Sequence, residues 1–252
     1  METANNDRIL YGMLYDMRAM SGEVFKTEQG LAMLSPQTPL WIWLTQEGTD
    51  VDARVFFRAF LRQNNSFLIG LVAKKDIARA CTEIYLKEYG GSYNSEEIIS
   101  YFLPKSELKN LSTTAKGELR LPNAENAAVV FSWIEAFYKE TLHANMPQPS
   151  TEKKTESSAK TTVSIWWNEK PVAMGMVLDT GSKTSRLNLI YTPPDERGKG
   201  YGRALVTALA AKIHENGQVP ILYTETRNEG SNKLYKSIGF KEAGRLLEVR
   251  FK

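Results

Sequence analysis

The residues best suited to chemistry in this sequence form one short run that is rich in glycines and cations, residues 194–203. The run leads directly into residues 204–214, whose apolar residues recur at helical spacing. A helix N-terminus presents free backbone N–H groups and a partial positive charge. Gly200 and Gly202 lack side chains that would keep a phosphate away from those amides. The run therefore predicts a site for a phosphorylated ligand.

Two common phosphate-binding motifs do not fit this run. A Walker loop requires Gly-Lys followed by Ser or Thr, whereas Lys199 is followed by Gly200. A dinucleotide-binding fingerprint requires a third glycine at the position that Arg203 occupies. The run thus predicts phosphate binding but belongs to neither of these classes.

A second pattern lies downstream, in residues 228–240. It begins with Asn228, has Tyr235 seven residues later and ends in Gly239-Phe240. Together with residues 197–202 (Arg-Gly-Lys-Gly-Tyr-Gly), this pattern resembles the GNAT superfamily of N-acetyltransferases. In that superfamily, Arg/Gln-x-x-Gly-x-Gly/Ala is the loop that binds the pyrophosphate of coenzyme A.

Residues 191–194 (Tyr-Thr-Pro-Pro) also resemble a two-part group of predicted acetyltransferases within that superfamily. The order of the predicted helices and strands resembles that of the family over residues 117–252, and the motifs that make the resemblance specific lie between 187 and 240. Residues 1–114 show no such motif.

The resemblance implies roles for particular residues. In the family, the strand before the loop pairs through its backbone with the pantetheine amides and supplies an N–H to the tetrahedral oxyanion. The loop amides hold the pyrophosphate, an asparagine contacts the pantetheine arm with help from a nearby serine, and Tyr235 protonates the leaving thiolate. The expected coenzyme-binding residues are Leu189, Ile190, Tyr191, Thr192, Arg197, Gly198, Lys199, Gly200, Tyr201, Gly202, Arg203, Asn228 and Ser231.

Simpler interpretations exist for each of these residues when it is taken alone. Tyr235 could pack beneath Phe240 as a core residue, and Asn228 could cap a helix. The three cations of the run could be ordinary surface charges. Glu225 is a candidate for the general base, and taken alone it is a charge at a strand end. His214 is expected to be exposed and inert, because it does not share the spacing of the apolar residues in its helix.

The expected fold is α/β, with a GNAT-like mixed, largely antiparallel sheet flanked by helices and preceded by a smaller α/β N-terminal domain. The hydrophobic spacing that marks helices and strands weakens near residues 111–116. This predicts an N-terminal domain at 1–114 and an acetyltransferase domain at 115–252. One interpretation of residues 1–114 is a diverged copy of the same fold. Residues 145–162 are interpreted as a long loop rather than a linker between domains.

The hydrophobic patterns predict these individual elements. Helices are expected at 5–20, from a cap at Asp76, after Asn123, at 204–214 and at 231–237; strands are expected at 40–44, 67–73, 98–103, 117–121, 163–168, 172–178, 186–192, 221–226, 240–243 and 246–251. Residues 168–170 (Asn-Glu-Lys) predict a hairpin between the strands at 163–168 and 172–178.

The composition excludes several classes of protein and of partner. Cys81 is the single cysteine, which rules out an intrachain disulfide and fits a reducing compartment, and the spacing of histidine and cysteine predicts no metal site. No signal peptide or membrane span is indicated, so a cytoplasmic protein without a membrane partner is expected. Residues 1–114 hold 12 Lys and Arg against 14 Asp and Glu, and residues 115–252 hold 20 against 15. No basic cluster with interleaved aromatics suggests nucleic acid.

The expected function is transfer of acetyl from acetyl-CoA, a cosubstrate, to a primary amine of a small molecule or peptide. The amine would attack directly in a ternary complex, without a covalent enzyme intermediate and without a metal. Two alternatives stay open, namely a non-catalytic coenzyme A-binding module and another acyl or aminoacyl transferase.

Overall fold

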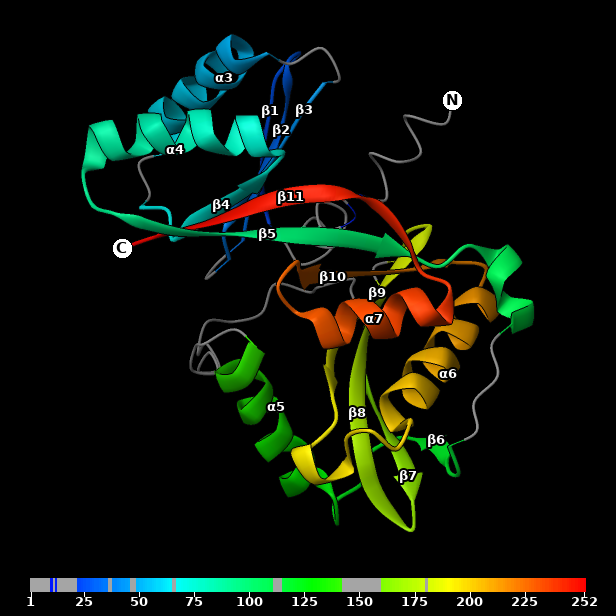
Figure 1. The fold of residues 1–252 in the computed structure, drawn as a ribbon. Helices are drawn as coiled ribbons and strands as arrows, with labels where there is room; N and C mark the ends of the chain where they lie inside the picture. The colour runs from blue at the N-terminus through cyan, green and yellow to red at the C-terminus, as the bar shows by residue number, and fades with distance from the viewer. Residues whose placement is uncertain are drawn as a thin grey trace. The chain divides into compact units, whose positions relative to one another are not determined.

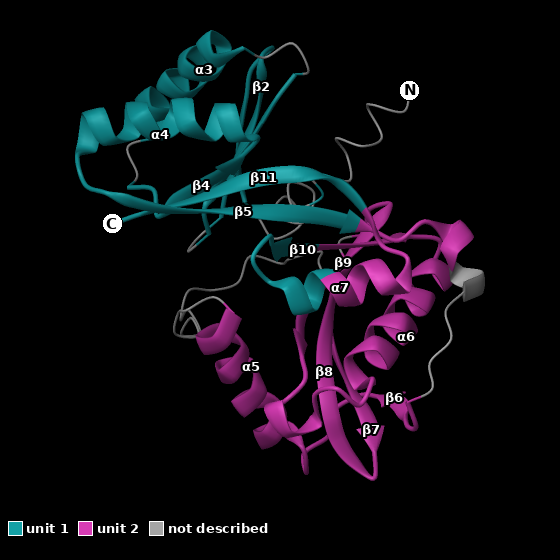
Figure 2. Ribbon diagram, in the orientation of Figure 1, with its two compact units in different colours: residues 1–101, 223–232, 242–252 teal, residues 102–222, 233–241 magenta. Residues whose placement is uncertain are grey.

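The computed structural model describes residues 10, 12, 22–35, 38–45, 49–64, 67–110, 115–141, 160–179 and 181–252. The chain divides into two compact units, which Figure 2 colours separately. Unit 1 takes its residues from 1–101, 223–232 and 242–252, and unit 2 takes its residues from 102–222 and 233–241. The expected division into domains at residue 114 stays a prediction.

In the described part of the chain, unit 1 consists mainly of strands and two complete helices, together with residues 223–232. Its elements are β1 (Glu23–Lys26), β2 (Gly30–Leu34), β3 (Leu40–Leu44), α3 (Asp50–Gln63), β4 (Gly70–Ala73), α4 (Lys75–Tyr89), β5 (Tyr93–Phe102) and most of β11 (Lys241–Phe251). Strands β1, β2 and β3 are antiparallel neighbours. Strand β4 runs parallel to β3, and β11 runs antiparallel to β4.

The core of unit 1 lies between its sheet and the apolar faces of α3 and α4, which lie together in Figure 1. Phe56, Phe57 and Phe60 of α3 are all buried, at the i, i+1 and i+4 spacing that faces one side of a helix. Cys81 of α4 is fully buried in the same core. Burial raises the pKa of its thiol, because the thiolate would lose hydration there. Cys81 is therefore a packing residue.

Unit 2 contains the elements around the glycine-rich run. Its elements are η1 (Lys105–Asn110), β6 (Glu118–Arg120), α5 (Ala127–Thr141), β7 (Lys160–Asn168), β8 (Lys170–Asp179), β9 (Thr184–Tyr191), η2 (Pro194–Glu196), α6 (Tyr201–Glu215), the first part of β10 (Val219–Glu225) and the second part of α7 (Glu229–Ile238). The strands lie in the order β10-β9-β8-β7-β6. Strand β10 is parallel to β9, and the other neighbouring pairs are antiparallel.

Helices α5 and α6 cover opposite faces of this sheet, as Figure 1 shows. Met174 packs in one cluster with Val130 of α5. The next residue along β8 is Gly175, and a Cβ there would lie 3.0 Å from the Leu209 side chain of α6. Because successive strand residues point to opposite faces, the two helices must lie on different sides. Glycine at position 175 lets α6 approach the sheet.

The expected mixed α/β fold with largely antiparallel strands and flanking helices is confirmed. The hairpin in the second half is also confirmed, since Asn168 pairs with Lys170 across Glu169, whose φ is 63°. No helix in the described ranges is long and apolar enough to cross a membrane.

Some expectations were wrong in detail. The two strands expected at 240–243 and 246–251 form the single strand β11. Asp76 does not cap α4; it lies in the first turn, after an N-cap at Lys74 that makes no side-chain cap bond. The helix α3 and the strands β1 and β2 were not predicted.

Two further expectations fall wholly or mainly on residues outside the described part of the chain. Of the helix expected at 5–20, only residues 10 and 12 are described. The loop expected at 145–162 lies outside the described residues up to 159, and residues 160–162 belong to β7.

Candidate functional site

The glycine-rich run begins helix α6. Gly200 is the N-cap, with φ 83° and ψ 0°, a left-handed conformation that glycine adopts without penalty. The first intrahelical bond runs from the N–H of Ala204 to the carbonyl of Gly200, at 3.0 Å. The N–H groups of residues 201–203 precede this bond, and Gly200 makes no side-chain cap bond to them. These amides can therefore serve an anion, with the helix dipole adding attraction.

Gly202 brings the start of α6 close to the end of β9. A Cβ on Gly202 would lie 3.2 Å from Oγ1 of Thr192 and 3.8 Å from Cδ2 of Leu234. The guanidinium of Arg203 also donates to Oγ of Ser237, at 2.6 Å. The structure thus brings the loop together with the second half of α7, which carries Tyr235.

Lys199 is engaged in an ion pair within the loop. Its Nζ lies 2.8 Å from Oε2 of Glu196, whose other oxygen lies 2.7 Å from Nζ of Lys170. The bond from Lys170 and then that from Lys199 lower the pKa of the Glu196 carboxyl. Lys170 begins β8, so these contacts fasten the loop to the sheet.

Arg197 is held by Glu140 of α5. An NH2–Oε2 distance of 2.6 Å joins them, and Nε of Arg197 donates to the carbonyl of Thr192 at 2.9 Å. The hydroxyl of Tyr191 donates to the other oxygen of Glu140 at 2.9 Å. The bond from Arg197 lowers the pKa of Glu140, whereas burial and the bond to Glu140 raise the pKa of Tyr191.

Sequence reasoning missed Glu140. A signal existed, because a carboxylate in the last turn of a helix opposes the helix dipole and therefore suggests another partner.

Strand β9 contains a bulge that sequence reasoning also missed. Met174 pairs with Tyr191 and Met176 pairs with Asn188, so three steps along β9 oppose two steps along β8. Leu189 has φ 49°, and its N–H donates to Oδ1 of Asn188 at 2.8 Å. A bulge disturbs the ladder and redirects backbone groups. It lies within residues 189–192, the stretch expected to pair with the pantetheine arm.

Tyr235 is buried, with 6% of its surface exposed. Its ring lies edge-on to that of Phe240, with centroids 5.8 Å apart. The packing interpretation of Tyr235 is thus seen in the structure. A role as proton donor is compatible with this position and stays a prediction.

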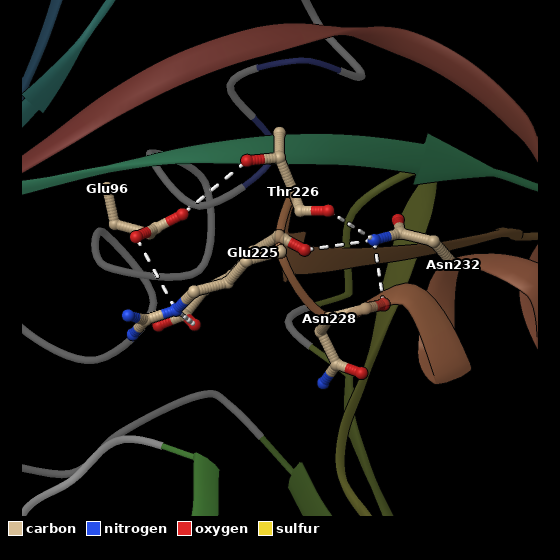
Figure 3. Close-up of polar contacts among 6 residues, drawn as sticks. Glu96, Glu225, Thr226, Asn228 and Asn232 are labelled. Carbon is tan, nitrogen blue, oxygen red and sulfur yellow. Dashed lines mark hydrogen bonds and ion pairs between the residues drawn. The ribbon is translucent and has the colours of Figure 1, made fainter.

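The turn that precedes α7 belongs to unit 1 and is drawn in Figure 3. Oδ1 of Asn228 accepts from the N–H of Ser231 at 3.1 Å, so Asn228 caps the helix. The carboxylate of Glu225 pairs with Nε of Arg227 at 2.7 Å. Asn232, which sequence reasoning did not select, donates to three carbonyls of this turn. The coenzyme-binding roles of Asn228 and Ser231 stay predictions.

His214 was expected to be exposed, and this was wrong. Only 6% of its surface is exposed. Burial lowers the pKa of its imidazole, and the charge of Lys105 contributes in the same direction.

Comparisons with known proteins bear on this geometry. Residues 173–249, which contain β9, the loop and α7, match a family model described as FR47-like protein. A sequence search of curated proteins gave no match.

Solved structures give similar folds. A GCN5-related N-acetyltransferase from Kribbella flavida aligns with 97% of this chain and 94% of its own, with 10% identity and a TM-score of 0.64. An acetyltransferase of the GNAT family from Colwellia psychrerythraea aligns with 100% and 94%, with 17% identity and a TM-score of 0.55. A tandem GNAT protein from the clavulanic acid biosynthesis pathway aligns with 88% and 78%, with 10% identity and a TM-score of 0.50.

These matches define a protein with a GNAT-type fold. The resemblance to the GNAT superfamily that the two motifs predict is confirmed, with residues 173–249 as its FR47-like segment.

Proposed function

We propose that this protein transfers an acetyl group from acetyl-CoA to a primary amine by direct attack in a ternary complex. The observation that carries the proposal is the N-terminus of α6, which Gly200 begins in a left-handed conformation and without a side-chain cap. A helix end of this kind suits a pyrophosphate, because three amides and the dipole converge there. Its position directly after a bulged strand supports coenzyme A as the donor.

In this proposal, different residues of unit 2 bind different parts of acetyl-CoA. In the proposal, the amides of residues 198–203 bind the pyrophosphate, and the backbone of residues 189–192 binds the pantetheine arm. A backbone N–H of that strand stabilises the oxyanion of the tetrahedral intermediate. Tyr235 gives its proton to the leaving thiolate, for which a phenol that stays protonated at neutral pH is suited.

Arg197 and Lys199 act mainly through the loop's shape in this proposal. Each has a carboxylate partner within 2.8 Å, which offsets much of its charge. Their expected role in coenzyme binding is therefore to hold the backbone rather than to serve as the main phosphate ligands. In this proposal the backbone amides make the dominant contribution to binding of the pyrophosphate.

In unit 1, Asn228 and Ser231 contact the pantetheine arm in this proposal. Glu225 is the candidate for the base that keeps the amine neutral. The acceptor that we propose is a small molecule or a peptide with a primary amine, with neither nucleic acid nor membrane as a partner.

We also propose that residues 1–114 descend from a copy of the same fold. The order β2-β3-α3-β4-α4-β5 repeats as β8-β9-α6-β10-α7-β11. In both series the first pair is antiparallel and the strands on either side of the first helix are parallel. The similarity to a tandem GNAT protein is in line with this repeat.

The first helix of the N-terminal series is unsuited to an anion. Thr49 caps α3, since the N–H of Asp52 donates to its Oγ1 at 3.3 Å, and Oδ2 of Asp52 accepts from the Thr49 N–H at 2.8 Å. Asp50 adds a further negative charge to the first turn. The N–H groups that α6 leaves for a ligand are thus partly used by side chains in α3. We therefore assign the donor to unit 2.

The experiment is a titration of the protein with coenzyme A by calorimetry, followed by a panel of amines with acetyl-CoA in which thiol release is measured. Saturable binding together with turnover on one amine class supports the proposal. Binding without turnover on any amine favours the non-catalytic module. Turnover with another acyl donor but not with acetyl-CoA favours the second alternative. Absence of coenzyme A binding contradicts the proposal.

A further inference from the structure

We propose that Asn232 is a positioning residue whose side-chain amide sets the turn at residues 225–228, so that Asn228 is presented to the pantetheine arm. This inference rests on the proposed function, because it assigns Asn228 to coenzyme A. Asn232 lies one helical turn after Asn228, on the first part of α7. It is largely buried, with 9% of its surface exposed.

The donor end of the Asn232 amide faces the turn backbone, as Figure 3 shows. Nδ2 lies 3.0 Å from the carbonyl oxygen of Glu225, 3.2 Å from that of Thr226 and 2.8 Å from that of Asn228. An amide nitrogen carries two hydrogens, so three carbonyls share them. One side chain thereby holds three of the four peptide groups in the turn.

The acceptor end of the same amide is fixed from the other side. Oδ1 of Asn232 accepts from the hydroxyl of Tyr101, at 3.0 Å. Tyr101 ends the buried part of β5 and is itself fully buried. A flipped amide would place Oδ1 against three carbonyl oxygens and Nδ2 against the hydroxyl, so this network assigns the orientation. The side chain thus has one favourable position, set by a strand distant in sequence.

Backbone hydrogen bonds also hold the turn, among them one from the N–H of Thr226 to the carbonyl of Glu97 at 2.9 Å and one from the N–H of Glu229 to the carbonyl of Arg227 at 2.9 Å. The N–H of Asn228 donates to the carbonyl of Glu225 at 3.1 Å, and the N–H of Asn232 donates to the carbonyl of Asn228 at 3.0 Å. Asn232 gives each of these two carbonyls a second hydrogen bond and adds one to Thr226. A buried network whose donors and acceptors are all satisfied rigidifies the turn and specifies one conformation.

The hydrogen bonds of Asn232 matter for function because they position Asn228. Its backbone carbonyl is held by Asn232, and its side-chain oxygen is held by the N–H of Ser231. A contact residue contributes to binding in proportion to how well it is held in its productive geometry. Loss of the Asn232 donors should therefore weaken coenzyme A binding more than it changes the chemical step.

The test compares Asn232→Asp, Tyr101→Phe and Asn64→Ala with the wild type. Aspartate keeps the shape and an acceptor for Tyr101, but when ionised it has no N–H and faces three carbonyl oxygens. Tyr101→Phe keeps Asn232 and removes only the hydroxyl that fixes it. Asn64→Ala is the matched control, because it also removes an asparagine bond to a helix carbonyl in unit 1, that of Phe60 at 3.0 Å.

Four quantities are measured in each protein: the Kd for coenzyme A by calorimetry, kcat at saturating acetyl-CoA, amide hydrogen exchange over residues 225–232, and Tm. We expect Asn232→Asp to raise Kd about tenfold, which is the effect of losing about 1.4 kcal/mol of binding. Its kcat should change by less than about threefold, and exchange in the turn should accelerate. Tyr101→Phe should give a smaller shift in the same direction. Asn64→Ala should lower Tm without changing Kd.

A lower Tm in Asn232→Asp with an unchanged Kd would show a purely structural role and overturn this inference alone. A fall in kcat at constant Kd would overturn it as well. If the wild type itself fails to bind coenzyme A, the proposed function and this inference fall together.

Discussion

The guanidinium of Arg197 is held by Glu140 at 2.6 Å, so the first cation of the glycine-rich run already has an anionic partner from α5. Both side chains are about half exposed, at 50% and 42%. An exposed pair of this kind contributes about 0–1 kcal/mol to stability. The pair therefore has little effect on the free energy of unfolding. Its main consequence is that the negative charge of Glu140 lies beside the loop.

The first prediction concerns Glu140→Gln. Glutamine keeps one acceptor oxygen for Arg197 and places its NH2 group beside the Tyr191 hydroxyl, which can accept from it, but it removes the negative charge and leaves an uncompensated cation beside the loop. We expect coenzyme A to bind about twofold to threefold more tightly at low salt, with a steeper salt dependence, because screening acts on the freed charge. Calorimetry at two salt concentrations measures both effects. Adding Arg197→Gln should restore the wild-type salt dependence, and weaker binding by Glu140→Gln alone would contradict the prediction.

The second prediction compares two glycines of α6 that share a left-handed conformation. Gly200, with φ 83°, begins the helix, and Gly217, with φ 76°, follows its end. A Cβ at Gly217 would meet nothing within 4 Å, and one at Gly200 would make only an ordinary contact with Ala115, at 3.5 Å. Alanine at either position should therefore cost about 1–2 kcal/mol of stability through backbone strain alone.

Only Gly200→Ala should also raise the Kd for coenzyme A, because relief of its strain moves the amides that we propose to bind the pyrophosphate. Gly217→Ala is the control for strain without a change at the loop. Thermal unfolding and calorimetry on both variants separate the two effects. Equal Kd values in the two variants would show that the start of α6 does not bind the donor.

Sequence reasoning succeeded where the signal is local. Gly200 and Gly202 lie at the start of a helix. The apolar spacing of that helix and of the nearby hairpin strands is regular in the sequence. Residue types at fixed short spacing carry this information, since the turn and helix that they specify need no distant partner.

It failed where the partner lies elsewhere in the chain. Asn232 is held by Tyr101, which is separated from it by 131 residues, and Arg197 is held by Glu140, 57 residues away. The bulge at Leu189 depends on the register between β8 and β9, which the sequence of β9 alone does not specify. His214 breaks the apolar spacing of its helix yet is buried, because the chain around Leu103 contacts it.

The third prediction concerns Tyr235→Phe. The ring packs against Phe240, and phenylalanine keeps that contact, so Tm should change little. Loss of the proton donor that we propose should lower kcat about 100-fold or more, with an unchanged Kd for coenzyme A. Tyr85→Phe is the control, because it removes a buried tyrosine hydroxyl that bonds to the backbone of Leu68 in unit 1. If kcat is the same in Tyr235→Phe and the wild type, Tyr235 is a packing residue only.

The fourth prediction concerns stability against pH through His214. Burial lowers the pKa of this imidazole in the folded protein, so the folded state binds its proton less readily than the unfolded state does. Stability from this group is therefore complete above the unfolded pKa of about 6.5 and is lost as the pH falls below that value toward the lower folded pKa. The carboxylates with lowered pKa, which are Asp52, Glu140, Asp179 and Glu196, lose their contribution only at more acidic pH, below about 4.5.

Chemical denaturation between pH 7.5 and about 5 covers the histidine window. Burial raises the pKa of Glu248 toward this range, and because both proteins in the comparison keep Glu248, its contribution cancels. The comparison uses His214→Gln, with His143 replaced by glutamine in both proteins so that only one imidazole titrates. We expect the protein that keeps His214 to lose more stability across this window than His214→Gln does, because glutamine cannot take up a proton. Parallel stability curves for the two proteins would mean that His214 titrates alike in the folded and unfolded states, contrary to its burial.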